Sequence, residues 1–253
     1  MKIATWNVNS LRVRLDHVLS WLRMTSPDVL ALQETKVTDD LFPVAAFEAL
    51  GYYSACSGQS TYNGVALLTK SPLSTEVVTD FADFRDDQRR ILGISYQDLY
   101  LLNVYVPNGS AVGSEKYKYK LQWLMHLHAF LAERLCAHPK LVVLGDFNIA
   151  PTDQDIHDPA AWEGSILVSP AEREAWQALL SLGLCDSLAH TSCHYTWWDY
   201  RQGAFRRNHG ARIDHILLSK TLASSLQTCH IDREPRGWER PSDHTPVVVT
   251  LDY

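Results

Sequence analysis

Polar side chains able to bind a cation or a phosphate follow apolar, strand-like runs at six places in this sequence of 253 residues. The runs are TWN, ALQE, LLNVY, LVVLGDFN, ARID and PSDH, and the polar residues at their ends are Asn7, Glu34, Tyr105, Asp146, Asn148, Asp214, Asp243 and His244. In open α/β sheets, ligands bind beyond the ends of the strands. If all six ends meet at one rim, their carboxylates, amides, phenol and imidazole suit a divalent cation together with a phosphate ester.

LVVLGDFN is the strongest of these signals. Its apolar run predicts a fully buried strand, and Gly145 lets the backbone turn tightly before two polar residues. There Asp146 can orient or deprotonate an attacking water, and Asn148 can hydrogen-bond a phosphate oxygen or that water. Taken alone, an Asp and an Asn that only form a turn would be the commoner explanation.

The PSDH segment presents an Asp–His pair between Pro241 and Pro246, which stiffen the loop on both sides. His244 can donate a hydrogen bond to a phosphoryl oxygen if a carboxylate keeps it oriented or charged. Asp214, at the end of ARID, is the candidate for that carboxylate. The alternative is an exposed loop histidine without a catalytic role.

Glu34 follows PDVLALQ, an apolar run that has no structural need for a carboxylate at its end. As a hard oxygen ligand it suits Mg²⁺, which takes one or two protein carboxylates and keeps several waters. Asn7 ends the first predicted strand in a similar way. The alternatives are a surface Glu that begins a loop and an Asn that caps the helix beginning near residue 11.

The strands and helices that must bring these residues together alternate along the chain. Strand patterns cover residues 2–7, 28–33, 64–69, 90–96, 99–106, 140–146, 211–218 and 245–251. Helices are predicted between the first two strands, over 115–137, and from a capping box at Ser169. The longest irregular stretch, 149–168, directly follows DFN, and we expect it to form one wall of the site. Paired strands in both halves predict an α/β fold of two packed sheets flanked by helices, in a single domain over residues 1–253.

Composition is ordinary for a globular protein, with 46% hydrophobic and 21% charged residues. No apolar run approaches the roughly 20 residues that cross a bilayer, so no membrane partner is expected. MKIATWNVNS lacks a basic segment followed by an apolar signal core, which favours a cytoplasmic protein. The protein is expected to be a monomer. Scattered cysteines without a CxxC motif indicate reduced thiols at Cys56, Cys136, Cys185, Cys193 and Cys229.

The net charge of −6 argues mildly against a general nucleic-acid coat, although binding depends on local charge. Most basic groups, including Lys116, Lys118 and Lys120, read as solvated surface charge. The exception is the group from Arg201 to Arg212, which lies beside the aromatic residues of YTWWDYR. Basic and aromatic side chains together are typical of nucleic-acid contacts.

Eight segments, taken in order, resemble the exonuclease III branch of the apurinic/apyrimidinic endonucleases, within the endonuclease/exonuclease/phosphatase fold. They are TWNVNSLRVR, LQETKV, YNGVALLTK, NVYVPNG, GDFNIAPTDQDI, YTWWDYR, RIDHILLS and PSDHTPV, and they span the chain. The resemblance implies a four-layer α/β sandwich, with two packed mixed sheets flanked by helices and the site at one edge. It also implies a Mg²⁺-dependent DNA repair nuclease, with Mn²⁺ as a substitute metal and double-stranded DNA with abasic sites or 3′ ends as the substrate.

The same resemblance implies roles for individual residues. Glu34 would be the main metal ligand, with Asp243 near the metal and Asn9 close by. Asp146 would activate water and Asn7 would orient Asp146, while His244, oriented by Asp214, would donate to the phosphoryl oxygen. The residues expected to contact the phosphate or its DNA are Tyr105, Asn108, Asn148, Trp197, Arg201, Ala211, Arg212 and Ile213.

Ala211 departs from the relatives, which carry a larger Leu or Trp in the pocket for the abasic sugar or terminal nucleotide. Either the pocket is wider and less selective for a base-free sugar, or neighbouring loops fill the space. The balance of 3′→5′ exonuclease, 3′-end cleaning and abasic-site incision therefore stays open. The alternatives are a phosphatase or phosphodiesterase of another substrate class and a non-catalytic nucleic-acid-binding regulator.

Overall fold

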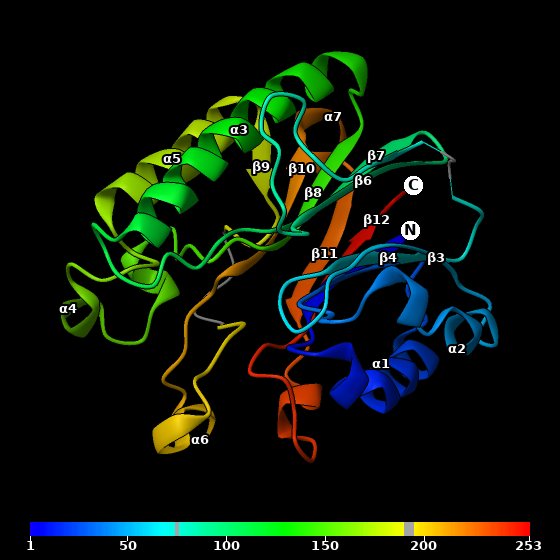
Figure 1. The fold of residues 1–253 in the computed structure, drawn as a ribbon, viewed down its shortest axis with the longest axis horizontal. Helices are drawn as coiled ribbons and strands as arrows, with labels where there is room; N and C mark the ends of the chain where they lie inside the picture. The colour runs from blue at the N-terminus through cyan, green and yellow to red at the C-terminus, as the bar shows by residue number, and fades with distance from the viewer. Residues whose placement is uncertain (74–75, 190–194) are drawn as a thin grey trace.

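Two six-stranded sheets form the centre of the protein in a computed structural model that describes residues 1–73, 76–189 and 195–253 (Figure 1). The first sheet has the order β11-β12-β1-β2-β4-β3. Its strands, in chain order, are β1 (Lys2–Asn7), β2 (Val29–Gln33), β3 (Tyr53–Ser57), β4 (Val65–Thr69), β11 (Leu226–Ile231) and β12 (Val247–Leu251). Within it β1 and β2 run parallel and the other pairs are antiparallel, so the sheet is mixed.

The second sheet has the order β5-β6-β7-β8-β10-β9. Its strands are β5 (Val77–Val78), β6 (Ile91–Tyr96), β7 (Leu99–Tyr105), β8 (Leu141–Asp146), β9 (Leu184–Asp186) and β10 (Asp214–Ser219). Here β7 and β8 run parallel, and the remaining neighbours are antiparallel. Each sheet therefore contains one parallel pair, whose carboxyl ends lie at the same edge.

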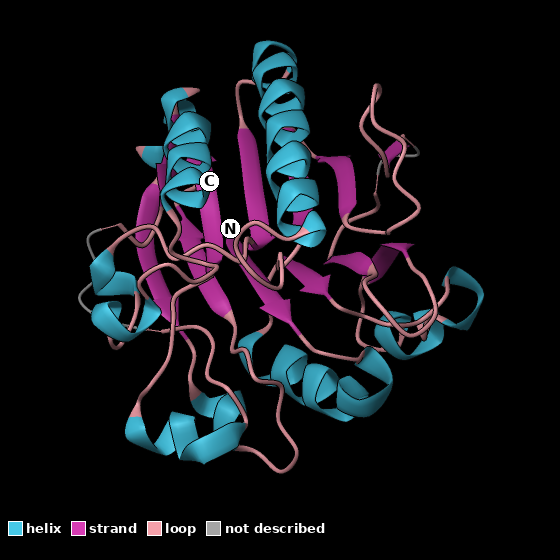
Figure 2. Ribbon diagram, turned by 60° about the vertical axis from the view of Figure 1, so that its left-hand side comes forward, coloured by secondary structure: helices cyan, strands magenta, loops and turns pink. Residues whose placement is uncertain are grey.

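Helices cover the outer face of each sheet, which gives four layers (Figures 1 and 2). On one side lie α1 (Leu11–Thr25) and α2 (Val44–Glu48), and on the other α3 (Glu115–Ala137) and α5 (Pro170–Ser181). Shorter elements are α4 (Pro159–Trp162), α6 (Ala204–Arg207), α7 (Lys220–Ala223), η1 (Asp39–Leu41), η2 (Asp153–Asp155), η3 (Arg201–Gly203) and η4 (Glu234–Gly237). Across the described ranges, no helix is both long and apolar enough to span a bilayer.

The apolar core between the sheets is continuous from β1 to β12, and branched residues from both inner faces fill it. Near one end of this core a polar bridge links the sheets. Asn103 on β7 donates to the carbonyl oxygens of Leu32 and Ala66 at 2.9 and 2.8 Å, and it accepts from Gln33 at 2.7 Å. Because these groups are fully buried and bonded across the interface, they fix how the two sheets align.

The predicted four-layer α/β sandwich is confirmed, and all eight predicted strands form. The four strands without a sequence prediction, β3, β5, β9 and β11, are the outermost strands of the two sheets. The predicted capping box of α5 is present at Ser169 and Glu172. The 149–168 stretch is less irregular than predicted, because it contains η2 and α4. Cys193 lies outside the described residues, and the other four cysteines are free thiols.

Candidate active site

The parallel strand pairs place the predicted polar residues at one edge of both sheets. Asn7 ends β1, while Tyr105 and Asp146 end β7 and β8 and are paired in register. Asp214 begins the antiparallel neighbour β10 directly opposite Asp146. Three adjacent strands of one sheet therefore present three of the expected side chains in a row, facing Asn7 on the other sheet.

Asn7 joins the two sheets at this edge through a single side-chain amide. Its Nδ2 donates to Glu34 Oε1 and to Asp146 Oδ2, each at 2.9 Å, and its Oδ1 accepts from the backbone N–H of Asn9 at 2.9 Å. The alternative that Asn7 caps the first helix is wrong, because Ser10 occupies the N-cap of α1. Asn7 is fully buried and instead fixes the separation of two carboxylates.

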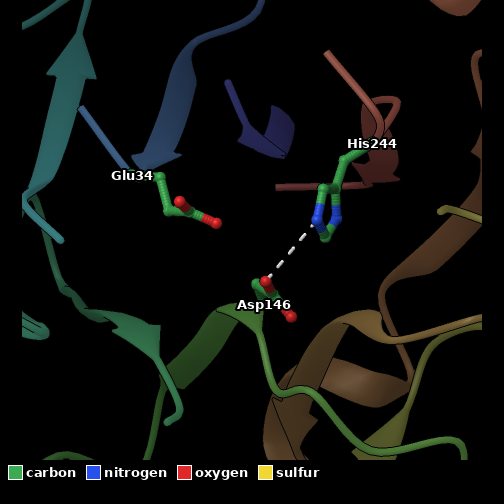
Figure 3. Close-up of side chains that lie close together, drawn as sticks. All are labelled: Glu34, Asp146 and His244. Carbon is green, nitrogen blue, oxygen red and sulfur yellow. Dashed lines mark ion pairs between the residues drawn. The ribbon is translucent and has the colours of Figure 1, made fainter. Parts of the chain in front are cut away.

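Glu34, Asp146 and His244 come from different elements and point toward one space (Figure 3). One ligand atom of each lies within 4.8 Å of the others. Figure 3 marks the ion pair between His244 Nε2 and Asp146 Oδ2, which are 3.8 Å apart. The three residues therefore present a carboxylate, a second carboxylate and an imidazole edge to one small volume.

His244 is held from behind by Asp214. Its Nδ1 lies 2.9 and 3.1 Å from the two Asp214 oxygens, and Asp214 is fully buried. The backbone N–H of His244 donates to Ser242 Oγ at 3.2 Å, and that hydroxyl donates to the carbonyl of Asn7 at 2.7 Å. His244 is only 4% exposed, so the alternative of an exposed loop histidine is wrong.

The charge state of this group follows from burial and from its neighbours. Burial disfavours the imidazolium, but the carboxylates of Asp214 and Asp146 outweigh it and raise the pKa of His244 to about 10. Burial also raises the pKa of Asp146 to about 7, with Asp214 adding to the effect and His244 and the Asn7 amide opposing it. At neutral pH the site therefore holds a protonated imidazole beside a carboxylate that is poised to exchange a proton.

Asn148 and Asn108 form the second half of the site. Asn148 has a left-handed backbone at φ 50°, and its N–H donates to Asp146 Oδ1 at 2.9 Å. Asn108 Nδ2 donates to Asn148 Oδ1 at 3.0 Å, which links the two amides side by side. Burial and the charges of Glu34 and Asp146 raise the pKa of Tyr105 well above its usual value, so it remains a neutral phenol. All three line the cavity that contains Asp146.

The oxygens around Glu34 fit a cation. Lys36 Nζ lies 2.9 Å from Glu34 Oε2 and 2.6 Å from Asn9 Oδ1, so an ammonium already bridges two of the predicted ligands. Asp243 is tied to this group through Asn9, whose Nδ2 donates to Asp243 Oδ1 at 2.9 Å. Carboxylate and amide oxygens of this kind suit Mg²⁺. The second Asp243 oxygen accepts from Trp197 Nε1 at 3.0 Å.

A cavity of about 380 Å³ opens over these groups. Its apolar wall is formed by Trp162, Ile166, Leu167, Trp197 and Ile213, and so the 149–168 segment does form one wall, as predicted. Asp199 and Arg201 complete the lining, and Arg201 donates to Asp199 at 2.6 Å. Trp197, Ile213 and Arg201, three of the residues expected to contact the substrate, therefore all line this cavity.

Ala211 and Arg212 do not line this cavity. Ala211 is fully buried, and Ile156 and Leu167 pack in the same cluster, so neighbouring loop residues fill the space beside its small side chain. Arg212 points elsewhere: its guanidinium donates to Asp155 at 2.6 Å and to Asp186 at 2.7 Å, with its side chain 9% exposed. This geometry gives Arg212 a structural ion-pair network in place of the DNA contact expected from the sequence.

Sequence reasoning gave no role to Lys36 or Ser242, although both lie inside the quoted motifs LQETKV and PSDHTPV. Both act on the site through local bonds that spacing does not reveal. The prediction that Lys120 carries solvated surface charge is wrong, because its side chain is fully buried. The helical spacing does indicate burial, because Lys120 lies three and four positions before Trp123 and Leu124, on the buried stripe of α3.

Two helix-covered sheets with a polar site at their common edge define the class of protein, an α/β sandwich whose site draws on both sheets. The family model for the endonuclease/exonuclease/phosphatase family matches residues 4–244. The chain belongs to this family, in its exonuclease III and apurinic/apyrimidinic endonuclease branch.

Similar proteins cover the whole chain. Exodeoxyribonuclease III of Haemophilus influenzae is 34% identical over 98% of both chains. Two structures of NExo from Neisseria, one described as a 3′ phosphatase bound to a product DNA hairpin and one as a 3′-5′ exonuclease, are 46% identical over 100% of both chains, with TM-scores of 0.98 and 0.97. An AP endonuclease structure from Archaeoglobus fulgidus is 38% identical over 100% of both chains, with a TM-score of 0.97.

Proposed function

We propose that this protein is a Mg²⁺-dependent DNA repair nuclease that hydrolyses phosphoester bonds at the 3′ ends of duplex DNA. The observation that carries the proposal is the arrangement of Asp146 between Asn7 and His244 at the floor of a cavity, with Glu34 facing it. Similarity to a Neisseria 3′ phosphatase and 3′-5′ exonuclease over the full chain supports the choice of 3′ ends.

The residues divide the chemistry between proton transfer and charge stabilisation. Asp146, with a pKa raised to about 7 by burial, accepts the proton of the attacking water. The imidazolium of His244 and the neutral phenol of Tyr105 donate to the phosphoryl oxygens, where negative charge increases during attack. Asn148 adds an amide donor from the same wall.

Glu34 and Asn9 would hold Mg²⁺, with Asp243 as the neighbour that orients Asn9. When bound, the ion would act as a Lewis acid that neutralises charge on the phosphoryl group and leaving oxygen. Lys36 competes for the same oxygens, and it can move because its side chain is 23% exposed. Mn²⁺ has similar ligand preferences and would substitute.

The cavity wall supports a terminal nucleotide or a sugar as the group that lies beside the phosphate. Trp162 and Trp197 form an apolar surface next to the carboxylates, and a nucleotide or deoxyribose can pack on it. Incision 5′ to abasic sites is the second activity, because an AP endonuclease with the same fold is 38% identical to this chain. Both activities use the same hydrolysis at the floor of the cavity.

Two labelled duplexes test the proposal with purified protein and Mg²⁺, one ending in a recessed 3′-phosphate and one carrying a central abasic analogue. Release of phosphate and shortening from the 3′ end, abolished by EDTA, are expected. Incision at the abasic analogue alone would make internal lesions the substrate. If neither duplex were cleaved but the protein bound DNA tightly, the result would favour a non-catalytic regulator. Hydrolysis of a non-nucleic-acid phosphodiester with neither duplex cut would favour another substrate class.

A further inference from the structure

Lys120 is a fully buried lysine whose ammonium lies directly behind the candidate active site. It donates to the carbonyl oxygen of Asn148 at 2.6 Å and to that of Asn108 at 3.3 Å. Its third partner is the carboxylate of Glu172. An ammonium has three hydrogens, so all three donors of Lys120 are satisfied by protein atoms.

Glu172 connects this ammonium to the wall of the cavity. Its side chain is fully buried and accepts from the backbone N–H groups of Leu167 and Ser169, each at 3.0 Å, and from Ser169 Oγ at 2.6 Å. Leu167 lines the cavity, and Ser169 is the N-cap of α5. The ion pair therefore ties the start of α5 and one wall of the site to α3.

The loop that carries Asn108 is fitted closely around the Lys120 stem. Gly109 follows Asn108 with φ +95°, and a Cβ at this position would lie 3.2 Å from Lys120 Cδ. The carbonyl of Gly109 accepts from Ser114 Oγ at 2.9 Å, and Ser114 also caps α3. The N-cap residue of α3 and Lys120 in its second turn thus both contact the loop that carries Asn108.

The two carbonyls that Lys120 binds belong to Asn108 and Asn148, which both line the cavity of the candidate site. Asn108 and Asn148 are bonded to each other through their amides at 3.0 Å. Asn148 has a left-handed backbone at φ 50°, a conformation that Asn adopts more readily than most non-glycine residues. Fixing both carbonyls on one ammonium sets the distance between the two backbones and thereby the position of both amides.

We propose that Lys120 is a positioning residue for the Asn108–Asn148 amide pair, and that it sets the rate of phosphoester hydrolysis more than it stabilises the fold. The proposal rests on the proposed function, because it assigns the amide pair to the phosphate. A buried ion pair is weak evidence for stability, since apolar replacements of both partners are often neutral or stabilising. A fully buried Lys–Glu pair at this place is therefore better explained by geometry at the site.

A double-mutant cycle separates the two roles, with Lys120→Met, Glu172→Gln and the combined variant. Either single change leaves one buried charge without its partner and lowers the melting temperature, and the combined variant recovers the part of that loss that comes from the unpaired charge. Unlike the melting temperature, the rate is expected to depend on Lys120 alone. The kcat for phosphate release from a 3′-phosphoryl duplex falls roughly 10- to 100-fold in both variants lacking Lys120. KM changes less than kcat, because the defect lies in the geometry of the reacting group.

The matched control is Lys118→Met with Glu115→Gln, an exposed lysine–glutamate pair on the same helix. Its kcat and melting temperature are expected to equal those of the wild type within error. A kcat that tracked the melting temperature across the whole cycle would reduce Lys120 to a structural residue. Wild-type kcat in the combined variant would overturn the proposal outright.

A second readout does not depend on activity. The side-chain amide resonances of Asn108 and Asn148, measured by NMR in metal-free protein, are expected to shift or broaden in the combined variant and stay unchanged in the control. If the wild type hydrolyses neither duplex, the proposed function fails, and this readout still decides the geometry. Unchanged amide resonances in the combined variant would refute the positioning role independently of any assay.

Discussion

Two buried groups of charges lie close to the same strand ends and differ in what they leave free. In the pair of Lys120 and Glu172, protein groups satisfy all three ammonium donors and both carboxylate oxygens. In the group of Asp146, His244 and Asp214, the imidazole edge and the Asp146 carboxylate face a cavity. The comparison teaches that burial by itself does not mark a candidate reactive site: what distinguishes the second group is that its side chains still face a cavity in which a ligand could bind.

Replacing Asp146 by Asn tests the open group with the largest expected effect. The amide cannot accept the proton of the attacking water, so kcat should fall by roughly 10²- to 10⁴-fold while DNA binding persists. Single-turnover kinetics and a DNA-binding titration measure the two quantities separately. Near-normal turnover would remove Asp146 from its role as the proton acceptor.

Removing the Glu34 carboxylate tests the cation site. Glu34→Ala should raise the Mg²⁺ concentration for half-maximal activity by at least about 10-fold, because Mg²⁺ depends on few protein carboxylates. Mn²⁺ binding measured by electron paramagnetic resonance gives a readout without turnover. Unchanged titrations for both metals would count against Glu34 as the main ligand.

The pH dependence of the rate tests the charges of the open group. Because the pKa of Asp146 is raised to about 7, kcat/KM should fall about tenfold per pH unit below pH 7, as the carboxylate gains a proton. Asp214 raises the pKa of both Asp146 and His244, so Asp214→Asn should move the acid limb and any alkaline limb to lower pH. A profile whose limbs stay in place in Asp214→Asn would contradict this coupling.

The pH dependence of the stability of the metal-free protein tests the raised pKa of Asp146 in the second group. Asp146 has a folded pKa above its unfolded value, so its contribution is present below about pH 4 and is lost as pH rises through about 7. Asp146→Asn should therefore unfold at higher denaturant concentration than wild type at pH 8, and the difference should shrink at pH 5. Chemical denaturation at the two pH values measures it, and an equal difference at both would contradict the assignment.

Ala211 gives the smallest expected effect. Since its surroundings are already filled, Ala211→Leu should overpack the cluster around Leu167 and cost about 1–3 kcal/mol of unfolding free energy. A displaced Leu167 would also alter the cavity wall and shift the ratio of 3′-end trimming to abasic-site incision. If stability and ratio both stayed constant, position 211 would control neither packing nor pocket choice.

Sequence patterns predicted the strand ends well because the central strands are buried on both faces. Such strands appear as continuous apolar runs, and the residue that breaks the run marks the edge of the sheet. The outermost strands were missed for the same reason: β3 and β11 are half-exposed and carry polar residues along much of their length. Because these outer strands are exposed, they lack the continuous apolar run from which a buried strand is predicted.

Side-chain direction at single positions could not be predicted in the same way. Ile213 lines the cavity and its neighbour Arg212 points to Asp155 and Asp186, because adjacent residues of an extended chain face opposite sides. Lys120 shows the converse error, since a short run of alternating lysines resembles surface charge unless its helical spacing is considered. Partners that are distant in sequence, such as Glu172 for Lys120, determine where these side chains point, and the local sequence does not reveal them.

The bridge made by Asn7 has a consequence for how this protein tolerates change. One amide holds Glu34, which directly follows β2 of the first sheet, and Asp146 of the second sheet, so the spacing between the sheets sets the spacing between the proposed metal ligand and the proposed proton acceptor. Residues that fill the space between the sheets therefore affect the geometry of the proposed site as well as the fold. A substitution there would lower the turnover rate before it caused the protein to unfold. The core would therefore tolerate fewer substitutions than its contribution to stability alone would allow.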